Sequence, residues 1–199
     1  VVRVTARDGV GVAGVAVSFG APAGGKVGAA SVTTDANGTA STSLTLGGVV
    51  GPQSFSVAAG GFSVSIPATA TPGDAAAVVV VSGGNQSDTV KHALALPLVA
   101  KVTDQFGNAV SDATVTWQRT AGSGALSGTS SVTGADGLAT VRYTLGAVSG
   151  VETITASLPG ASAPASFTET ALAGAPALIA AVTGNAQAAR VFKTVAAFV

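Results

Sequence analysis

The chain has 199 residues, and its nine Lys or Arg balance its nine Asp or Glu, so the formal net charge at pH 7 is zero. The basic residues stand singly, which excludes the electropositive surface that nucleic-acid binding requires. The hydrophobic fraction is 47%, the charged fraction is 9% and cysteine is absent, so we expect a folded chain held together without disulfide bonds.

The N-terminal residues predict two strands joined by a glycine-containing turn. Val15, Val17 and Phe19 alternate with small or polar residues. This period of two places the three side chains on one face of a half-buried strand. A glycine-rich loop over residues 21–25 follows.

A polar turn that leads into an alternating strand comes next, and it recurs later in the chain. Residues 33–47 and 133–146 are the two copies, and Gly38 and Gly137 within them lie 99 positions apart. Asn-Gly and Asp-Gly favour tight turns because these residue types tolerate positive φ. In the second copy we expect the side chains at alternate positions to face the interior, namely Ala139, Val141, Tyr143 and Leu145.

The N-terminal strands recur as well, at an offset of 98, so that Val4 matches Val102 and Phe19 matches Trp117. Short strands separated by turn signals at regular spacing predict an all-β protein built from tandem β-sandwiches. Its later strands are expected at residues 55–58, 62–66, 153–156 and 165–170.

The second unit begins with a lead-in that the first unit lacks. It consists of an apolar run at residues 75–81, a Gly-Gly-Asn-Gln segment from Gly83, and residues 93–98. Val1 corresponds to Val99 in the repeat, so the equivalent lead-in of the first unit would fall before Val1.

A third lead-in, residues 177–187, loosely matches residues 76–86. The alanine-rich residues 187–199 fit a strand, a coil or a short helix equally well. We therefore expect an incomplete domain at residues 1–71 that lacks its first strand or strands, a complete domain at residues 72–172, and the start of a third unit or a terminal fragment at residues 173–199.

Several motifs of the second unit occur together: the Gly-Asn-Gln lead-in, residues 96–110, Val-Thr-Trp at 115–117, Asp-Gly-x-Ala at 136–139 and Thr-Leu-Gly at 144–146. In combination they resemble the bacterial immunoglobulin-like domain of the invasin and intimin group. The resemblance implies Ig-like sandwiches of Greek-key topology, strung as stalks in extracytoplasmic proteins that are often adhesins. The first unit departs from the motif because Ala6 stands where the second has Asp104, so no general binding or capping role is expected for that aspartate.

The sequence predicts no catalytic, cofactor-binding or metal site. His92 is the only histidine, so neither a Ser-His-Asp triad nor a His-based zinc site can be assembled; we expect an exposed or half-exposed strand residue. The carboxylates are spread out, with no sign of the close pair in a cleft that glycoside hydrolysis needs. They are Asp8, Asp35, Asp74, Asp88, Asp104, Asp112, Asp136, Glu152 and Glu169.

Two weaker site patterns have structural interpretations. Residues 35–38 partly match a calcium loop, but the later ligands are missing, so Asp35 is expected to form a turn. Calcium near Asp74, between the domains, is left open. The pairs Gly24-Gly25 and Gly83-Gly84 lack the Lys-Ser/Thr and helix of a phosphate-binding loop.

Trp117 and Tyr143 could form a platform that stacks on a sugar, but alternation places both on the inward face of their strands. Phe19 and Leu44 occupy the matching positions of the first unit. Because these replacements are generic apolar residues, we expect core packing at all four positions.

The leading hypothesis is a non-enzymatic spacer or stalk segment of a bacterial extracytoplasmic protein, located in the periplasm, at the cell surface or secreted. Its partners would be further Ig-like repeats of the same chain or other proteins, without a cofactor, and no apolar run is long enough for a membrane helix. An accessory subunit docked on a larger membrane-associated assembly is the first alternative, because a surface of low charge is desolvated at little cost. A carbohydrate-binding module is the second.

Overall fold

The structure is a computed structural model that describes residues 1–180. This part of the chain is all-β and contains no helix. Its strands are β1 (Val2–Arg3), β2 (Ala16–Gly20), β3 (Lys26–Val27), β4 (Ser31–Thr33), β5 (Thr39–Ala40), β6 (Leu44–Thr45), β7 (Gly51–Ala59), β8 (Phe62–Ala70), β9 (Ala77–Ser82), β10 (Ser87–Thr89), β11 (Leu98–Thr103), β12 (Thr114–Ala121), β13 (Ala125–Leu126), β14 (Ser130–Val132), β15 (Leu138–Val141), β16 (Tyr143–Thr144), β17 (Gly150–Ser157) and β18 (Ala165–Leu172).

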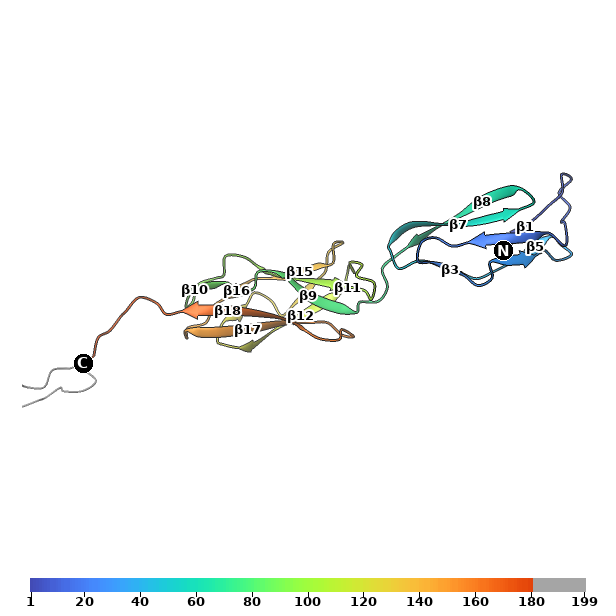
Figure 1. Ribbon diagram of the computed structural model, residues 1–199. Helices are drawn as coiled ribbons and strands as arrows, with labels where there is room; N and C mark the ends of the chain where they lie inside the picture. Colours follow the sequence, from blue (N-terminus) through green and yellow to red (C-terminus); the bar gives the residue numbers. More distant parts are fainter. Residues whose placement is uncertain (181–199) are drawn as a thin grey trace, which may run out of the picture.

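The strands form two elongated groups that lie end to end (Figure 1). We call β1–β8 the first module and β9–β18 the second module. Among the strands that the structure describes, none of one module pairs with a strand of the other.

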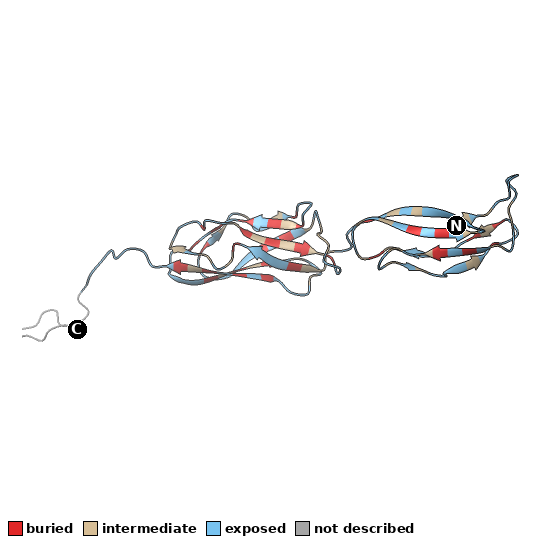
Figure 2. Ribbon diagram, turned by 45° about the horizontal axis from the view of Figure 1, so that its top comes forward, coloured by how far each residue is buried: buried red, intermediate tan, exposed pale blue. Residues whose placement is uncertain are grey.

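The second module is a complete sandwich. One sheet has the strand order β10-β18-β17-β12-β14, and the other has the order β15-β11-β9, with the short pair β13-β16 beside it. All pairings are antiparallel except that of β10 with β18. Side chains from both sheets enter one core. Buried and exposed residues follow one another along the strands (Figure 2).

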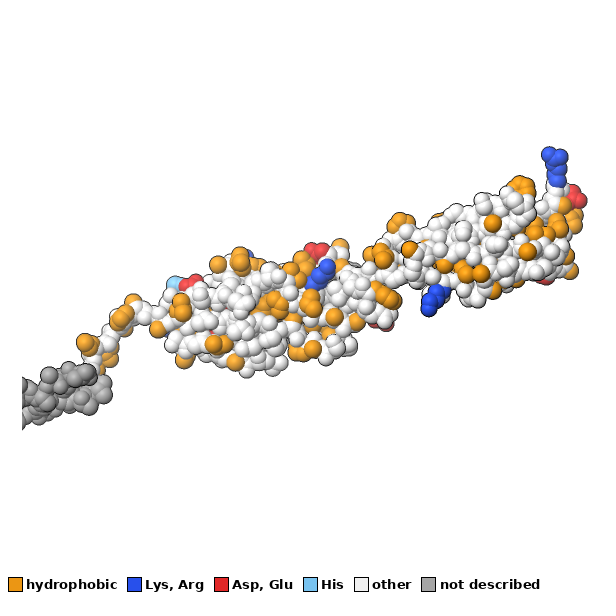
Figure 3. Space-filling view, in the orientation of Figure 1, with side chains coloured by type: hydrophobic (Ala, Val, Ile, Leu, Met, Phe, Trp, Pro, Cys, Tyr) orange, Lys and Arg blue, Asp and Glu red, His pale blue; other side chains and the backbone are white. Residues whose placement is uncertain are grey.

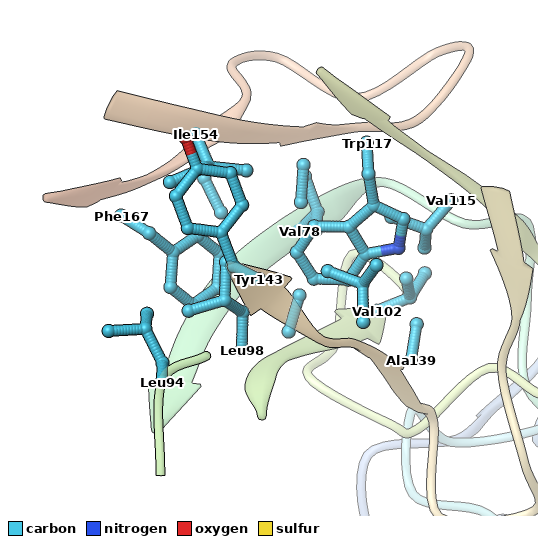
Figure 4. Close-up of a cluster of buried hydrophobic side chains, with 14 of the residues drawn as sticks. Val78, Leu94, Leu98, Val102, Val115, Trp117, Ala139, Tyr143, Ile154 and Phe167 are labelled. Carbon is cyan, nitrogen blue, oxygen red and sulfur yellow. The ribbon is translucent and has the colours of Figure 1, made fainter. Parts of the chain in front are cut away.

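The alternation expected after Gly137 is confirmed. Ala139, Val141, Tyr143 and Leu145 are buried, whereas the residues between them are exposed. Trp117 is 1% exposed, and its ring packs against Phe167 at a centroid distance of 5.6 Å (Figure 4). Burial of large side chains at about 25 cal/mol per Å² makes this cluster the main source of stability in the module.

The first module repeats the same pairing with fewer strands. Its sheets have the orders β4-β2-β7-β8 and β1-β5, with the short pair β3-β6 beside them. Val2 pairs with Ala40 as Ala100 pairs with Ala139 in the second module. Its core cluster contains only four buried residues, Val17, Phe19, Ala40 and Val57.

The prediction that Leu44 lies in the core of the first module is wrong. Leu44 is 38% exposed, whereas Tyr143, its counterpart in the second module, is 1% exposed. Tyr143 contacts Glu152, and the first module has Gln53 at the position of Glu152. A shorter side chain and a smaller core therefore leave Leu44 at the surface.

Residues 173–180 follow β18 without forming a strand, and all of them are exposed. The third lead-in extends beyond the described residues, and the possible helix over residues 187–199 lies entirely outside them. Within residues 1–180, no helix is long and apolar enough to cross a membrane.

Candidate functional site: the junction between the modules

The turn at residues 104–108 is where the second module meets the first. The Asp104 amide donates to the carbonyl of Asn108 (3.0 Å), and the Gly107 amide donates to the carbonyl of Asp104 (3.1 Å). Gly107 has a φ of 86°, a conformation that glycine adopts at little cost. The sequence Asp-x-x-Gly-Asn thus folds locally into a closed turn at the end of β11.

The Asp104 carboxylate, only 3% exposed, holds this turn and the linker together. Its Oδ1 accepts the amides of Phe106 and Asn108, each at 2.9 Å. Its Oδ2 accepts the Asn108 side-chain amide (2.8 Å) and the amide of Gly73 in the linker (3.0 Å). These donors stabilise the charged form, the Asn108 side chain most of all, and lower the pKa of Asp104 to about 2.

Asn108 carries the contact across to the first module. Its Nδ2 donates to the carbonyl of Gly48 at 2.8 Å, and its Oδ1 lies 3.5 Å from the amide of Val50. The Phe106 ring covers Gly48 so closely that a Cβ at that position would lie 2.6 Å from the ring. Residue 48 must therefore be small for the two modules to approach in this way.

The matching turn of the first module lacks these two polar side chains. The Ala6 amide still donates to the carbonyl of Val10 (2.8 Å), and the Gly9 amide to that of Ala6 (3.0 Å), so the backbone turn is retained. Ala6 and Val10 stand at the positions of Asp104 and Asn108, however, and supply no polar side chain. Among the described residues, the second turn alone binds a linker and a loop of another module.

Sequence reasoning missed the junction, although its signal was present. The replacement of Asp104 by Ala6 in the first unit argues against a general binding or capping role for the aspartate, but it does not exclude a role in the second unit alone. In the structure, Asp104 and Asn108 of the second unit bind the linker and the first module. A difference between two repeats can thus mark a contact that one of them makes.

A second group that the sequence did not reveal is a pair of buried carboxylates. Glu152 on β17 and Glu169 on β18 are directly opposite each other, 1% and 0% exposed. They fall at inward positions of the same period of two that buries Ile154 and Phe167, so the pattern could have identified them. Their counterparts in the first module, Gln53 and Ala68, are also paired but carry no charge.

The two carboxylates have different surroundings. Glu152 accepts the Tyr143 hydroxyl (2.6 Å) and the amides of Gly146 (2.9 Å) and Ser123 (3.3 Å). Burial, together with this carboxylate, raises the pKa of Tyr143. Glu169 Oε2 accepts the amide of Gln86 at 2.7 Å, while its Oε1 is buried without a partner. Burial raises the pKa of Glu169 to about 7.

The aromatic residues proposed as a possible sugar platform are not accessible. Trp117 and Tyr143 are each 1% exposed, and Trp117 Nε1 donates to Ser131 Oγ at 2.8 Å. Their assignment to the core is confirmed. These two side chains are therefore not available to stack on a sugar.

His92 lies in a turn after β10 rather than on a strand, which corrects the expected position. Its side chain is 63% exposed, and Nδ1 lies 3.3 Å from Asp88 Oδ1. This contact is an exposed pair near the C-terminal end of the second module. It has the geometry of a surface interaction.

The turn at Asp35 has the structure expected from its sequence. Asp35 Oδ1 accepts the amides of Asn37 (2.8 Å) and Thr39 (2.9 Å), and Oδ2 accepts the Thr39 hydroxyl (2.6 Å). The Thr39 side chain, first among these donors, lowers the pKa of Asp35. In the equivalent turn, Asp136 Oδ1 accepts the amide of Leu138 at 3.0 Å.

Asp74 in the linker is exposed. Across residues 1–180, no three His, Cys, Asp or Glu side chains come close enough together to hold a metal ion. Calcium at the junction gains no support from this arrangement, and the polar contacts of Asp104 and Asn108 join the modules directly.

The comparison with known proteins finds a family match within the second module. Residues 93–170 match the bacterial Ig-like domain (group 1). No curated protein matches the sequence.

Solved structures of bacterial surface proteins resemble the chain over most of its length. FdeC, an adhesin of Escherichia coli, is 20% identical with a TM-score of 0.56, over 84% of this chain and 56% of that chain. InvD of Yersinia pseudotuberculosis is 22% identical with a TM-score of 0.54, over 94% and 54%. The D0-D1 domain of intimin is 20% identical with a TM-score of 0.35, over 83% of each chain.

The chain spans about half the length of the FdeC and InvD structures. At these identities the likeness concerns the fold alone. Residues 93–170, which carry most of the motifs of the second unit, thus match the family of bacterial Ig-like domains (group 1), and the fold of the chain resembles those of FdeC and InvD.

Proposed function

We propose that the chain is a non-enzymatic spacer segment of a bacterial extracytoplasmic protein, in which tandem Ig-like modules set the distance and direction between other parts. The division at residues 1–71, 72–172 and 173–199 belongs to this proposal. The observation that carries it is the junction, where Asp104 binds the linker and Asn108 binds the preceding module. A hydrogen-bonded junction restricts bending, whereas a free linker would let the modules rotate independently.

The charge distribution is consistent with a spacer. Charged side chains are sparse and stand apart on the visible face, and most of that surface is formed by uncharged polar groups and backbone (Figure 3). The buried interior is filled by apolar side chains and by the two carboxylates. Stability arises from packing within each module, and the visible face carries no concentrated charge.

The bacterial Ig-like family and the adhesin fold of FdeC support an extracytoplasmic location. Antibodies raised against residues 1–180 should label intact cells of the source bacterium, or cells whose outer membrane alone has been opened. Labelling that requires lysis of the cytoplasmic membrane would contradict the location.

A docking role remains the second candidate because of an exposed apolar strand. Val79, Val80 and Val81 on β9 are 48%, 43% and 50% exposed, and β9 is the last strand in the order β15-β11-β9. Edge strands with exposed branched side chains are sites of protein pairing. Val79→Lys combined with Val81→Lys should abolish docking on a larger assembly and leave the junction unchanged.

The spacer proposal is tested by the distance between the modules. The chain has no cysteine, so Ser31→Cys with Ser130→Cys introduces two unique labels at exposed, equivalent strand positions. Spin labels on this pair should give a narrow distance distribution by pulsed electron paramagnetic resonance. The further change Asn108→Ala should broaden it, because both contacts of that side chain with the first module are lost.

The matched control is Asp8→Ala, which alters the equivalent turn of the first module. Asp8 Oδ1 accepts the amide of Val10 at 3.0 Å, and Asp8 makes no hydrogen bond to the second module. The distribution should stay narrow in this variant. A wild-type distribution as broad as that of Asn108→Ala would overturn the spacer proposal.

A further inference from the structure

The loop between β6 and β7 is the part of the first module that Asn108 contacts. We call residues 47–50 the acceptor loop, which lies at the end of the first module that faces the second (Figure 1). Asn108 Nδ2 donates to the carbonyl of Gly48 at 2.8 Å, and Oδ1 lies 3.5 Å from the amide of Val50. Both contacts are with backbone groups, so they depend on the path of the loop backbone.

One side chain of the first module holds this path. Gln53 lies near the start of β7 and is half-buried. Its Oε1 accepts the amide of Gly47 at 2.8 Å, and its Nε2 donates to the carbonyls of Gly47 at 3.1 Å and Val49 at 2.6 Å. Three backbone groups of the acceptor loop therefore share one side chain as their partner.

These contacts fix the orientation of the Gln53 side-chain amide. A carboxamide has one acceptor oxygen and one nitrogen with two donor hydrogens. The opposite orientation would place the nitrogen against the Gly47 amide and the oxygen against two carbonyl oxygens. The observed orientation satisfies all three backbone groups and uses both hydrogens of Nε2.

The contact with Val49 connects Gln53 to the junction through a single peptide group. The carbonyl of Val49 and the amide of Val50 belong to the same planar trans unit, in which C=O and N–H point in opposite directions. Gln53 Nε2 binds the carbonyl end, and Asn108 Oδ1 lies at the amide end. Binding of the carbonyl by Gln53 therefore directs the N–H of Val50 towards the second module.

The carbonyl of Gly48, which Asn108 also binds, is placed by the same side chain. It belongs to the peptide group between residues 48 and 49, and Gln53 binds the carbonyls of the groups before and after it. Glycine has more backbone freedom than any other residue. The two fixed neighbours restrict that freedom, so Gly48 can be small enough to lie beneath the Phe106 ring and still present its carbonyl to Asn108.

The second module carries a different side chain at the equivalent position. Glu152 Oε1 accepts the amide of Gly146 at 2.9 Å, as Gln53 Oε1 accepts that of Gly47. Its Oε2 accepts the Tyr143 hydroxyl. Ionised glutamate has no donor, so it can hold the first amide of this loop but cannot bind a carbonyl two residues later.

We propose that Gln53 is the positioning residue of the junction, because it orients the Val49–Val50 peptide group towards Asn108. This side chain makes the first module an acceptor for the turn at residues 104–108. Ionised glutamate at the same position is incompatible with that role, since its charged oxygen would face carbonyl oxygens. The inference rests on the proposed spacer function and adds the residue that determines which loop can receive such a turn.

The test is Gln53→Glu in the full chain that carries the spin labels at residues 31 and 130. At pH 7 the distance distribution should become as broad as that of Asn108→Ala, because the carboxylate repels the Val49 carbonyl and loses its hydrogen bond. At about pH 3.5 the introduced carboxyl group is protonated, since the ordinary pKa of glutamate is about 4.3 and the facing carbonyls raise it. It can then donate to Val49 and accept from Gly47, so the distribution should return to the wild-type width.

Three control samples separate this effect from other consequences of pH. The wild type should stay narrow at both pH values, because the pKa of Asp104 is about 2 and its carboxylate remains charged. Gln53→Met keeps the length of the side chain without its amide and should be broad at both. Glu152→Gln, the matched change in the second module, should stay narrow, because Glu152 bonds to residues of its own module.

Amide hydrogen exchange along β7 and β8 establishes that the first module is folded in each variant. A narrow distribution for folded Gln53→Glu at pH 7 would overturn the proposal, and for an unfolded Gln53→Glu the same criterion applies to Gln53→Met. Broadening that persists at the lower pH would exclude donation to Val49 as the cause. Broadening in Glu152→Gln would also contradict a specific role for Gln53.

Failure of this inference is distinguishable from failure of the spacer function. A narrow wild type and a broad Asn108→Ala, together with a narrow Gln53→Glu, would leave the spacer function standing and remove only the role of Gln53. A broad wild type would contradict the spacer function itself.

Discussion

In the first module Val2 pairs with Ala40, and in the second Ala100 pairs with Ala139, yet within residues 1–180 only the second pairing has a further strand beside it. The difference changes the burial of the same positions. Val102 is 0% exposed beneath β9, whereas Val4 is only partly buried. Equal register in two repeats therefore does not produce equal burial, because the burial of a side chain depends on which strands pack beside it.

The modules also differ in where they place polar groups. The second has Asp104 and Asn108 at the junction and Glu152 and Glu169 in its interior. The first has apolar or neutral residues at all four equivalent positions. The comparison can be tested by changing one module and using the equivalent position of the other as the control.

The largest expected effect is that of Trp117→Ala. Loss of a fully buried indole leaves a cavity and should lower the free energy of unfolding of the second module by about 3–5 kcal/mol. Phe19→Ala in the first module should cost less, about 2–3 kcal/mol, because its cluster of buried residues is smaller. Differential scanning calorimetry, with one transition assigned to each module, measures both. Equal losses would show that the first module is as tightly packed as the second.

The next effect concerns the pH dependence of the second module. The pKa of Glu169 in the folded state is about 7, above its ordinary value of 4.5. The folded state therefore binds more protons between these values, and stability falls by about 2–3 kcal/mol as pH rises through this window.

Glu169→Gln should remove that fall and raise the melting temperature at pH 8. The first-module transition, where Ala68 is the counterpart, should not change with pH in this window. Urea unfolding of both proteins at pH 4.5 and pH 8 provides the measurement. A wild-type transition that is as stable at pH 8 as at pH 4.5 would contradict the assignment.

A smaller effect is expected for Tyr143→Phe. The change removes the hydroxyl that donates to Glu152 and leaves a buried carboxylate with one donor fewer. The expected cost is about 1–2 kcal/mol in the second module. At the equivalent position, Leu44→Ala should cost under about 1 kcal/mol, since Leu44 is 38% exposed. Chemical denaturation of the two variants compares them directly, and a larger loss for Leu44→Ala would be inconsistent with its exposure.

The smallest effect on overall stability is expected at the junction. The pKa of Asp104 in the folded state is about 2, below its ordinary value of 3.8. The stabilisation of the junction by the charged Asp104 carboxylate is therefore present above pH 3.8 and is lost as pH falls through 2. The spin-label distance distribution should broaden over this range in the wild type. Asp104→Asn should be broad already at neutral pH, and a distribution unaffected by this change would exclude Asp104 from the junction.

Much of each module followed from alternation and turn chemistry. The strands β12, β15, β17 and β18 were expected near their observed positions, and β18 extends to Leu172, two residues beyond the expected end. Asp35 forms the turn that its sequence favours. Local geometry decides these features, since a period of two and a positive φ are properties of a few neighbouring residues.

The candidate site could not be predicted in the same way. Asn108 bonds to Gly48 across sixty positions of sequence, and Phe106 packs on the same glycine. No local pattern connects these residues. The partial exposure of Leu44 was missed for a similar reason, because it depends on the size of the core around it.

The amino-acid sequence by itself determined the all-β class, the repeat and the side of each strand that faces the interior, because these follow from residue spacing within single strands and turns. Only the tertiary structure decided that Glu152 and Glu169 oppose each other and that Asp104 and Asn108 join the two modules. The physical reason is that burial and hydrogen bonding between distant segments depend on how strands assemble, and that assembly is a property of the whole chain.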